Sequence, residues 1–280
     1  MKERARDEHC KNFRLSIGEP WYVERSNVAG RALVPSAVSE RVFVNAGGCS
    51  WSSNQSISYE MEWQLQGPEQ YRALSTRRRA KQPPMNGWLY DAMTKGPEQK
   101  LLGPIRAALL GEISGEIVEL GAGTGLNFPY YPAAARVRAI EPNASMLAKA
   151  KTRAPLVSAH IDLAQGGDEV LDAIAEGTLD AVVATLVFCS VDDPTRTMQR
   201  VLRVLKPGGR FVTMEHVRDV TGWGRLQSLL TPVWCRVCAN CHLDRDMERT
   251  IREAGYSSVR LQERKMPPPA FRLLYGEALR

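Results

Sequence analysis

A glycine-rich stretch near the middle of the chain has the residue types and spacing of a ligand-binding turn. Gly121, Gly123 and Gly125 follow the short apolar run of "IVELGAGTG", which also contains Glu119, and Glu141 ends the next run in "VRAIEPN". Glycines directly after a strand let the backbone approach a ligand closely. A carboxylate at the end of the next strand accepts hydrogen bonds from ribose hydroxyls in nucleotide sites. The spacing therefore predicts a ligand that contains a ribose.

The position of the third glycine argues against a dinucleotide. The fingerprint G-x-G-x-x-G needs Gly or Ala at its sixth position, where this chain has Leu126, and Gly125 comes one residue early. A pyrophosphate ligand is therefore disfavoured, and the glycines would instead allow close contact with an uncharged part of the ligand.

Two later apolar runs end in polar residues. Glu215 and His216 close "MEHV", while Cys189 and Ser190 close "TLVFCSV". Strand carboxyl ends meet at the ligand edge of a doubly wound sheet, so these groups are expected there. An imidazole with an ordinary pKa of about 6.5 can take a proton from a thiol of pKa about 8.5 with modest help. Glu215 and His216 are the predicted catalytic residues, with loop-backbone hydrogen bonding as the structural alternative.

Three of the six cysteines lie close together in "CRVCANCH", as Cys235, Cys238 and Cys241, with His242 next. This spacing begins an iron–sulfur run, and three Cys with one His could bind zinc. A fourth cysteine at telling spacing is missing, and adjacent Cys241 and His242 are awkward ligands for one tetrahedral ion. A helix that uses Cys as a small hydrophobic residue is favoured, and no metal is predicted.

Length and composition favour one domain with an extension. The chain has 280 residues, is 44% hydrophobic, and carries most of its net charge of +6 in residues 1–84. That part lacks sustained periodicity and predicts a weakly ordered extension or linker. Residues 85–280 predict the catalytic domain. No apolar run reaches the roughly 18 residues of a membrane span, and the charged N-terminus does not resemble a signal peptide. A cytoplasmic location is expected, with peripheral membrane contact left open.

From residue 85 onward, helical and strand patterns alternate as in an α/β protein. Helices are expected in 96–113, 143–154 with Asn143 as N-cap, and 192–209. Buried strands are expected in 115–120, 179–191 and 209–217, and an antiparallel pair in 258–264 and 272–279. Together they predict a doubly wound, mostly parallel, seven-stranded Rossmann-like sheet with a C-terminal antiparallel pair.

The turn "ELGAGTG" resembles the E-x-G-x-G-x-G motif of class I S-adenosylmethionine-dependent methyltransferases. The stretches "TLVFCSV", "MEHV" and "CHLDRD", spread through residues 85–280, are similar to the methyltransferase-like thiol S-methyltransferases and to the ubiquinone/menaquinone methyltransferases. This resemblance implies S-adenosylmethionine as cofactor. Two features depart from the pattern, since the hydrophobic N-terminal anchor of the animal thiol enzymes is absent and the ribose acid is Glu141 where Asp is commoner.

The resemblance also implies individual cofactor contacts. Met146 would pack on the adenine, and Asp168 or Glu169 would reach the adenine amino group, with Asp162 as the second choice. Tyr90 would bind the cofactor carboxylate through its hydroxyl. The residues expected to bind the cofactor are Tyr90, Glu119, Gly121, Gly123, Gly125, Glu141, Met146, Asp168, Glu169 and Leu186.

The implied reaction is methyl transfer to a small, largely apolar acceptor. A thiol is favoured, with a quinone or a phospholipid amine as alternatives. Cys189 and Ser190 would line the methyl group. Nucleic-acid amino methyltransferases carry Asn or Asp, then Pro-Pro and an aromatic, at the place where this chain has "TLVFCS", so a nucleic-acid partner is not expected. A cofactor-binding interaction module and a cysteine-cluster metal protein remain alternatives of other classes.

The segment around "CHLDRD" is expected to close the acceptor pocket. Asp244 is predicted as N-cap of the following helix. Trp223, Trp234 and Phe188 would suit an apolar acceptor. The oligomeric state is left open.

Overall fold

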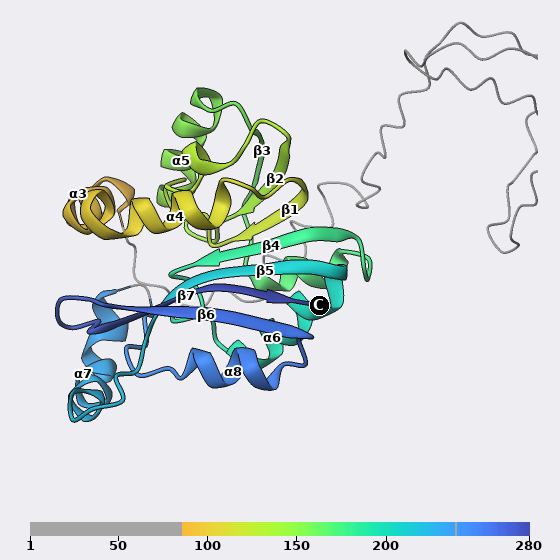
Figure 1. The fold of residues 1–280 in the computed structure, drawn as a ribbon. Coiled ribbons are helices and arrows are strands. Elements are labelled where there is room, and N and C mark those ends of the chain that lie inside the picture. The colour runs from red at the N-terminus through yellow and green to blue at the C-terminus, as the bar shows by residue number, and fades with distance from the viewer. Residues whose placement is uncertain (1–85, 239) are drawn as a thin grey trace, which may run out of the picture. The chain divides into compact units, whose positions relative to one another are not determined.

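The computed structural model describes residues 86–238 and 240–280 (Figure 1). The extension predicted over residues 1–84 lies outside the described residues, so that domain boundary stays a prediction. Among the described residues, no helix combines the length and the hydropathy that crossing a membrane requires.

A single seven-stranded sheet carries the domain, in the order β3-β2-β1-β4-β5-β7-β6. The first five strands are parallel, and β7 runs antiparallel between β5 and β6. The strands are β1 (Gly115–Leu120), β2 (Ala135–Ile140), β3 (His160–Ala164), β4 (Leu179–Thr185), β5 (Leu205–Val217), β6 (Ser258–Lys265) and β7 (Arg272–Leu279). The strand order reverses between β1 and β4, where such sheets bind ligands. The predicted Rossmann-like sheet with its antiparallel pair is confirmed.

Two strand boundaries differ from the prediction. The fourth strand ends at Thr185 rather than at residue 191, because Leu186 adopts φ 59° and its N–H donates to the carbonyl of Met214 at 2.7 Å. The "LKPGG" stretch begins β5 instead of ending the preceding helix. The early end of β4 leaves residues 186–191 as a loop at the ligand edge of the sheet.

Several helices begin at residues with the expected capping chemistry. Asn143 accepts hydrogen bonds from the N–H groups of Ser145 and Met146, as predicted, and Asp193 accepts one from Arg196. Asp246, not Asp244, is the N-cap of the last helix, because its carboxylate accepts from the N–H of Arg249 at 3.1 Å. The helices are α3 (Gly87–Pro97), α4 (Gly103–Leu110), α5 (Ala144–Arg153), α6 (Pro194–Val204), α7 (Trp223–Val237) and α8 (Met247–Glu253). Shorter helical segments are η1 (Glu98–Leu102), η2 (Phe128–Tyr130), η3 (Ala154–Leu156) and η4 (Asp168–Ala173).

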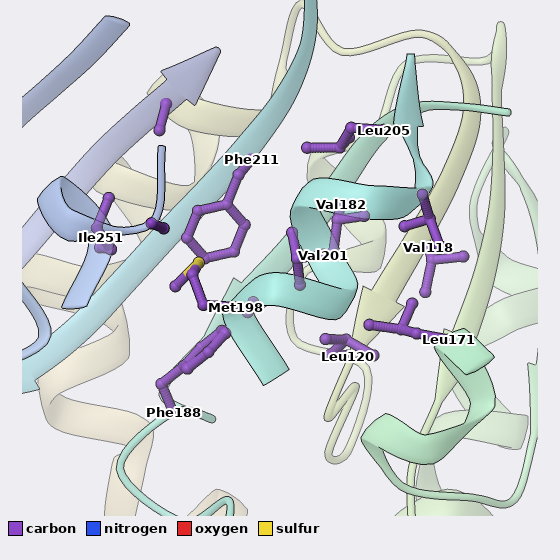
Figure 2. Close-up of a cluster of buried hydrophobic side chains, with 14 of the residues drawn as sticks. Val118, Leu120, Leu171, Val182, Phe188, Met198, Val201, Leu205, Phe211 and Ile251 are labelled. Carbon is purple, nitrogen blue, oxygen red and sulfur yellow. The ribbon is translucent and has the colours of Figure 1, made fainter. Parts of the chain in front are cut away.

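Apolar side chains fill both faces of the sheet. Figure 2 shows Met198 and Val201 of α6 packed over Val182 and Phe211, with Ile251 of α8 beside them. A second cluster on the other face involves α4 and α5 (Figure 1). Truncating a large buried side chain in such a layer costs about 2–5 kcal/mol. Helices on both faces of the sheet therefore fix the strand ends that carry the site.

Candidate active site

The three glycines of the turn after β1 have different roles. All have positive φ, at 61° for Gly121, 58° for Gly123 and 83° for Gly125. A Cβ at Gly121 would lie 2.5 Å from the side chain of Val187, and one at Gly125 would lie 2.5 Å from Phe128. A Cβ at Gly123 would meet nothing nearer than the carbonyl oxygen of Gly121, at 4.0 Å. Gly121 and Gly125 thus serve close packing, while Gly123 leaves open space above the backbone.

The carboxylate of Glu141 lies beside that space. Its Oε2 accepts from the N–H of Gly123 at 2.8 Å, and its Oε1 accepts from the N–H of Asn143 at 2.7 Å. Burial raises the pKa of Glu141, and these two backbone hydrogen bonds oppose that shift. Two N–H donors thus hold the carboxylate, and each oxygen retains a lone pair for a further donor such as a hydroxyl.

Glu119 lies beneath the turn and is bound by side chains on both oxygens. The amide of Asn127 donates to Oε1, and the hydroxyl of Tyr131 donates to Oε2, both at 2.9 Å. Arg106 donates to Asn127 and to Thr185, linking the network to the end of β4. Burial raises the pKa of Glu119 to about 7. Sequence reasoning missed Arg106, Asn127 and Tyr131, because three polar residues dispersed over 26 positions carry no local pattern.

Three other predicted cofactor residues surround this edge. Burial raises the pKa of Tyr90 to about 12, and the positive charge of Arg106 opposes that shift. Met146 is buried in the first turn of α5. Leu186, with its positive φ, begins the loop after β4.

The acids after β3 are bound by other parts of the protein. Asp168 accepts from the hydroxyl of Thr197 and from Arg200, each at 2.6 Å, which ties η4 to α6. Glu169 accepts from the N–H of Gly167 at 3.0 Å, within its own loop. Asp162 lies in the middle of β3 and pairs with Arg138 across the strands. All three acids therefore bind other parts of the protein. The contact of Asp168 or Glu169 with the adenine stays a prediction.

Glu215 is fully buried near the end of β5 and has one carboxylate oxygen free. Its Oε1 accepts from the N–H groups of Val187 and Phe188 at 2.7 and 2.9 Å, fixing the loop after β4. Its Oε2 has no hydrogen-bond partner. Burial raises the pKa of Glu215 to about 8, and the neighbouring Cys189 adds to the shift. Glu215 therefore binds the backbone of the loop after β4, as the structural alternative predicted, and also keeps one carboxylate oxygen without a partner.

His216 contacts two cysteines that are far apart in the sequence. Its Nε2 lies 3.0 Å from the Sγ of Cys241, and its Nδ1 is buried without a partner. The ligand atoms of Cys189, His216 and Cys241 all lie within 4.8 Å of one another. Burial alone would lower the pKa of His216, but the charges of Cys189 and Glu215 raise it. Hydrogen bonds from Cys241 and His216 lower the pKa of Cys189 well below its ordinary range.

The cysteine cluster seen in the sequence is divided in the structure. Helix α7 ends at Val237, before Cys238 and Cys241, and Cys235 donates from its Sγ to the carbonyl of Cys241 at 3.1 Å. His242 lies with its Nδ1 2.8 Å from the carbonyl of Asn240. Of the four predicted neighbours, only Cys241 joins His216 and Cys189.

The loop after α7 is fastened onto the loop after β4. The N–H of His242 donates to the carbonyl of Cys189 at 2.8 Å, and the amide of Asn240 donates to the carbonyl of Ser190 at 3.0 Å. Arg245 donates to the carbonyl of Phe188. These contacts hold Cys241 against Cys189. That residues 242–245 cap the acceptor pocket stays a prediction.

The predicted aromatic residues are dispersed. Phe188 is buried in the core, with its ring edge against Phe211 at a centroid distance of 5.6 Å. Trp223 is 55% exposed and stacks on Phe271 at 5.0 Å. Trp234, on the same helix, is half-buried. Phe188 and Trp223 therefore do not form one apolar wall.

The fold and the glycine turn together define a methyltransferase architecture. Residues 118–213 match the family described as methyltransferase domain. An O-methyltransferase family protein from Burkholderia thailandensis has a similar fold, with a TM-score of 0.54 over 69% of this chain and 59% of that one, at 12% identity. Over residues 118–213 the chain is therefore similar to methyltransferase domains.

Two curated relatives are similar to this chain over about half of its length. Thiol S-methyltransferase TMT1B from Rattus norvegicus is 37% identical over 165 residues, which cover 56% of this chain and 65% of that protein. Thiol S-methyltransferase TMT1A from Homo sapiens is 35% identical over 156 residues, covering 54% of this chain and 64% of that protein. The chain spans just under two thirds of the length of these relatives.

Proposed function

We propose that this protein transfers the methyl group of S-adenosylmethionine to the sulfur of a small, largely apolar thiol. One observation carries the proposal: Glu215 and His216 each keep a buried polar atom without a partner, close to Cys189 in the loop after β4. Unpaired buried polar atoms are costly and rare, and they gather at sites where a ligand completes them. The thiol relatives support sulfur as the acceptor atom.

The cofactor would occupy the space over Gly123. Its ribose hydroxyls would donate to Glu141, whose carboxylate two backbone N–H groups already orient. Tyr90 and Met146 lie around the same edge and would contact the amino-acid and adenine ends. In this arrangement the sulfonium methyl group would point toward the loop after β4, beside the unpartnered atoms of Glu215 and His216.

Methyl transfer to a thiol requires that the protein align the reacting atoms and that the thiol lose its proton. The sulfonium already activates the methyl group, so alignment of acceptor sulfur, methyl carbon and cofactor sulfur supplies much of the rate. A thiol must also lose its proton, because the thiolate is the nucleophile. Glu215 and His216 are the groups that could take this proton or stabilise the resulting charge.

The direct test is transfer of a labelled methyl group by the full-length protein to simple alkyl and aryl thiols, with quinol and amine acceptors in parallel. Labelled thioethers are the expected product. A label on quinols or amines alone would replace the thiol by one of those acceptor classes. Binding of S-adenosylhomocysteine with no transfer to any acceptor would instead indicate a cofactor-binding module.

A further inference from the structure

Three side chains from separate segments form one compact donor set at the acceptor end of the site. Cys189 lies in the loop after β4, His216 near the end of β5, and Cys241 in the loop after α7. Their ligand atoms lie within 4.8 Å of one another, and the Nε2 of His216 is 3.0 Å from the Sγ of Cys241. Cys189 is 3% exposed and His216 is 7% exposed, while Cys241 is half-buried.

Two thiolates and one imidazole are a donor set that zinc prefers. Structural zinc sites close the tetrahedron with four protein ligands, whereas catalytic sites use three and leave the fourth position for water or substrate. We propose that Cys189, His216 and Cys241 bind one zinc ion, and that the fourth position receives the sulfur of the acceptor thiol. The acceptor part of this inference rests on the proposed function, while the zinc site does not.

The surrounding contacts organise the set before any ion arrives. The hydrogen bonds from His242 and Asn240 to the loop carbonyls of Cys189 and Ser190 join the two cysteine-bearing loops. Glu215 fixes the loop after β4 from the other side through Val187 and Phe188. Two thiolates neutralise the charge of Zn²⁺, and Arg245 lies close enough to influence both cysteines. The geometry thus holds the thiols together without help from Cys238 or the ring of His242.

The ion would change how the acceptor thiol is activated. On binding, the thiol would give its S–H proton to the free Oε2 of Glu215 or to water, and its sulfur would bind zinc as a thiolate. His216 would then be a ligand and not the base. In the transfer step the sulfur electron pair forms a bond to the methyl carbon, the bond from methyl to the sulfonium breaks, and the products are a thioether and S-adenosylhomocysteine.

The test is Co²⁺ titration of the reduced, metal-stripped full-length protein. One Co²⁺ per chain is expected, with the thiolate charge-transfer and tetrahedral visible bands, and Zn²⁺ should displace it. In the presence of S-adenosylhomocysteine, an added thiol should shift the visible bands without turnover. Cys241→Ser should weaken Co²⁺ binding at least about tenfold, whereas Cys238→Ser, its matched control, should not. Unchanged S-adenosylhomocysteine binding would show that the Cys241→Ser protein remains folded.

Failure of this inference differs from failure of the proposed function. No Co²⁺ binding by the reduced protein, or equal loss in both cysteine variants, would overturn the zinc site. If protein with less than one metal ion per chain still methylated thiols at the full rate, zinc would take no part in the reaction, and the proposed function would stand. Conversely, Cys241-dependent Co²⁺ binding without thiol methylation would support the zinc site and contradict the proposed acceptor.

Discussion

The turn after β1 and the loop after β4 lie at the same edge of the sheet but are built by different means. At the turn, the contacts come from backbone: positive-φ glycines open the space, and two N–H groups orient Glu141. At the loop, side chains from three segments converge, namely Cys189, His216 and Cys241. The family match ends at residue 213, so it includes the turn but stops before Glu215 and His216. The two parts of the edge therefore differ in construction, backbone at the turn and converging side chains at the loop.

Two buried glutamates show the same contrast. Burial raises the pKa of Glu119 to about 7 and that of Glu215 to about 8. Both oxygens of Glu119 have side-chain partners, whereas Glu215 keeps Oε2 free. Similar burial therefore accompanies two different arrangements: side chains bind both oxygens of Glu119, whereas Glu215 has one oxygen without a partner.

The largest expected effect concerns the free oxygen. In Glu215→Gln, the amide oxygen can still accept from Val187 and Phe188, so only Oε2 is changed. We expect kcat for thiol methylation to fall about 10²–10³-fold, since a positioned proton acceptor contributes this much. Affinity for S-adenosylhomocysteine, measured by calorimetry, should stay within about twofold. A parallel loss of cofactor affinity would instead show that Glu215 acts through the fold.

The second prediction tests whether the raised pKa of Glu119 makes the stability of the fold depend on pH. Its pKa is about 7 in the folded state against an ordinary value near 4.5, so the folded state binds the proton more tightly. Stability from this group is complete below pH 4.5 and is lost as the pH rises through 7. Glu119→Gln removes this dependence. Between pH 5 and 8, the free energy of unfolding of the parent should fall relative to the variant by about 3 kcal/mol, measured by denaturant titration. Parallel pH profiles would contradict the shift.

The residues predicted to bind the cofactor can be named from the sequence because the patterns that indicate them are local. The three glycines and Glu141 lie within 21 residues, and each position has a backbone reason visible in the sequence. Alternating helix and strand patterns then fixed the sheet, apart from boundaries that depend on tertiary contacts. The end of β4 is one of these, because the turn at Leu186 is held by the carbonyl of Met214.

The acceptor end was only partly predictable. Glu215 and His216 follow from their place at a strand end, but the partners of His216 do not. The sequence groups Cys241 with Cys235 and Cys238, whereas the chain path brings it to Cys189, 52 positions earlier. Such a contact depends on where α7 ends and how the following loop returns over the sheet. Neither feature has a spacing signature.

The third prediction compares two glycines to separate loss of cofactor space from backbone strain as effects of an added methyl group. Gly123 and Gly208 have positive φ, at 58° and 76°, and a Cβ at either meets no protein atom closer than 4 Å. Alanine at either should therefore cost a similar 1–2 kcal/mol of stability. Only Gly123→Ala should also lower affinity for S-adenosylhomocysteine, about 30-fold, because its methyl group enters the ligand space. Equal affinities of the two variants would move the cofactor away from the turn.

The smallest effect is expected at the ribose. Glu141→Gln retains one oxygen acceptor but exchanges a charged hydrogen bond for a neutral one, and its amide group faces a backbone N–H. Affinity for S-adenosylhomocysteine should fall about five- to tenfold. The loss should be smaller for an analogue that lacks the ribose 2′-hydroxyl, because that analogue offers the carboxylate one donor fewer. If the variant lost the same factor for both ligands, Glu141 would act by shaping the turn around Gly123, and the backbone alone would recognise this end of the cofactor.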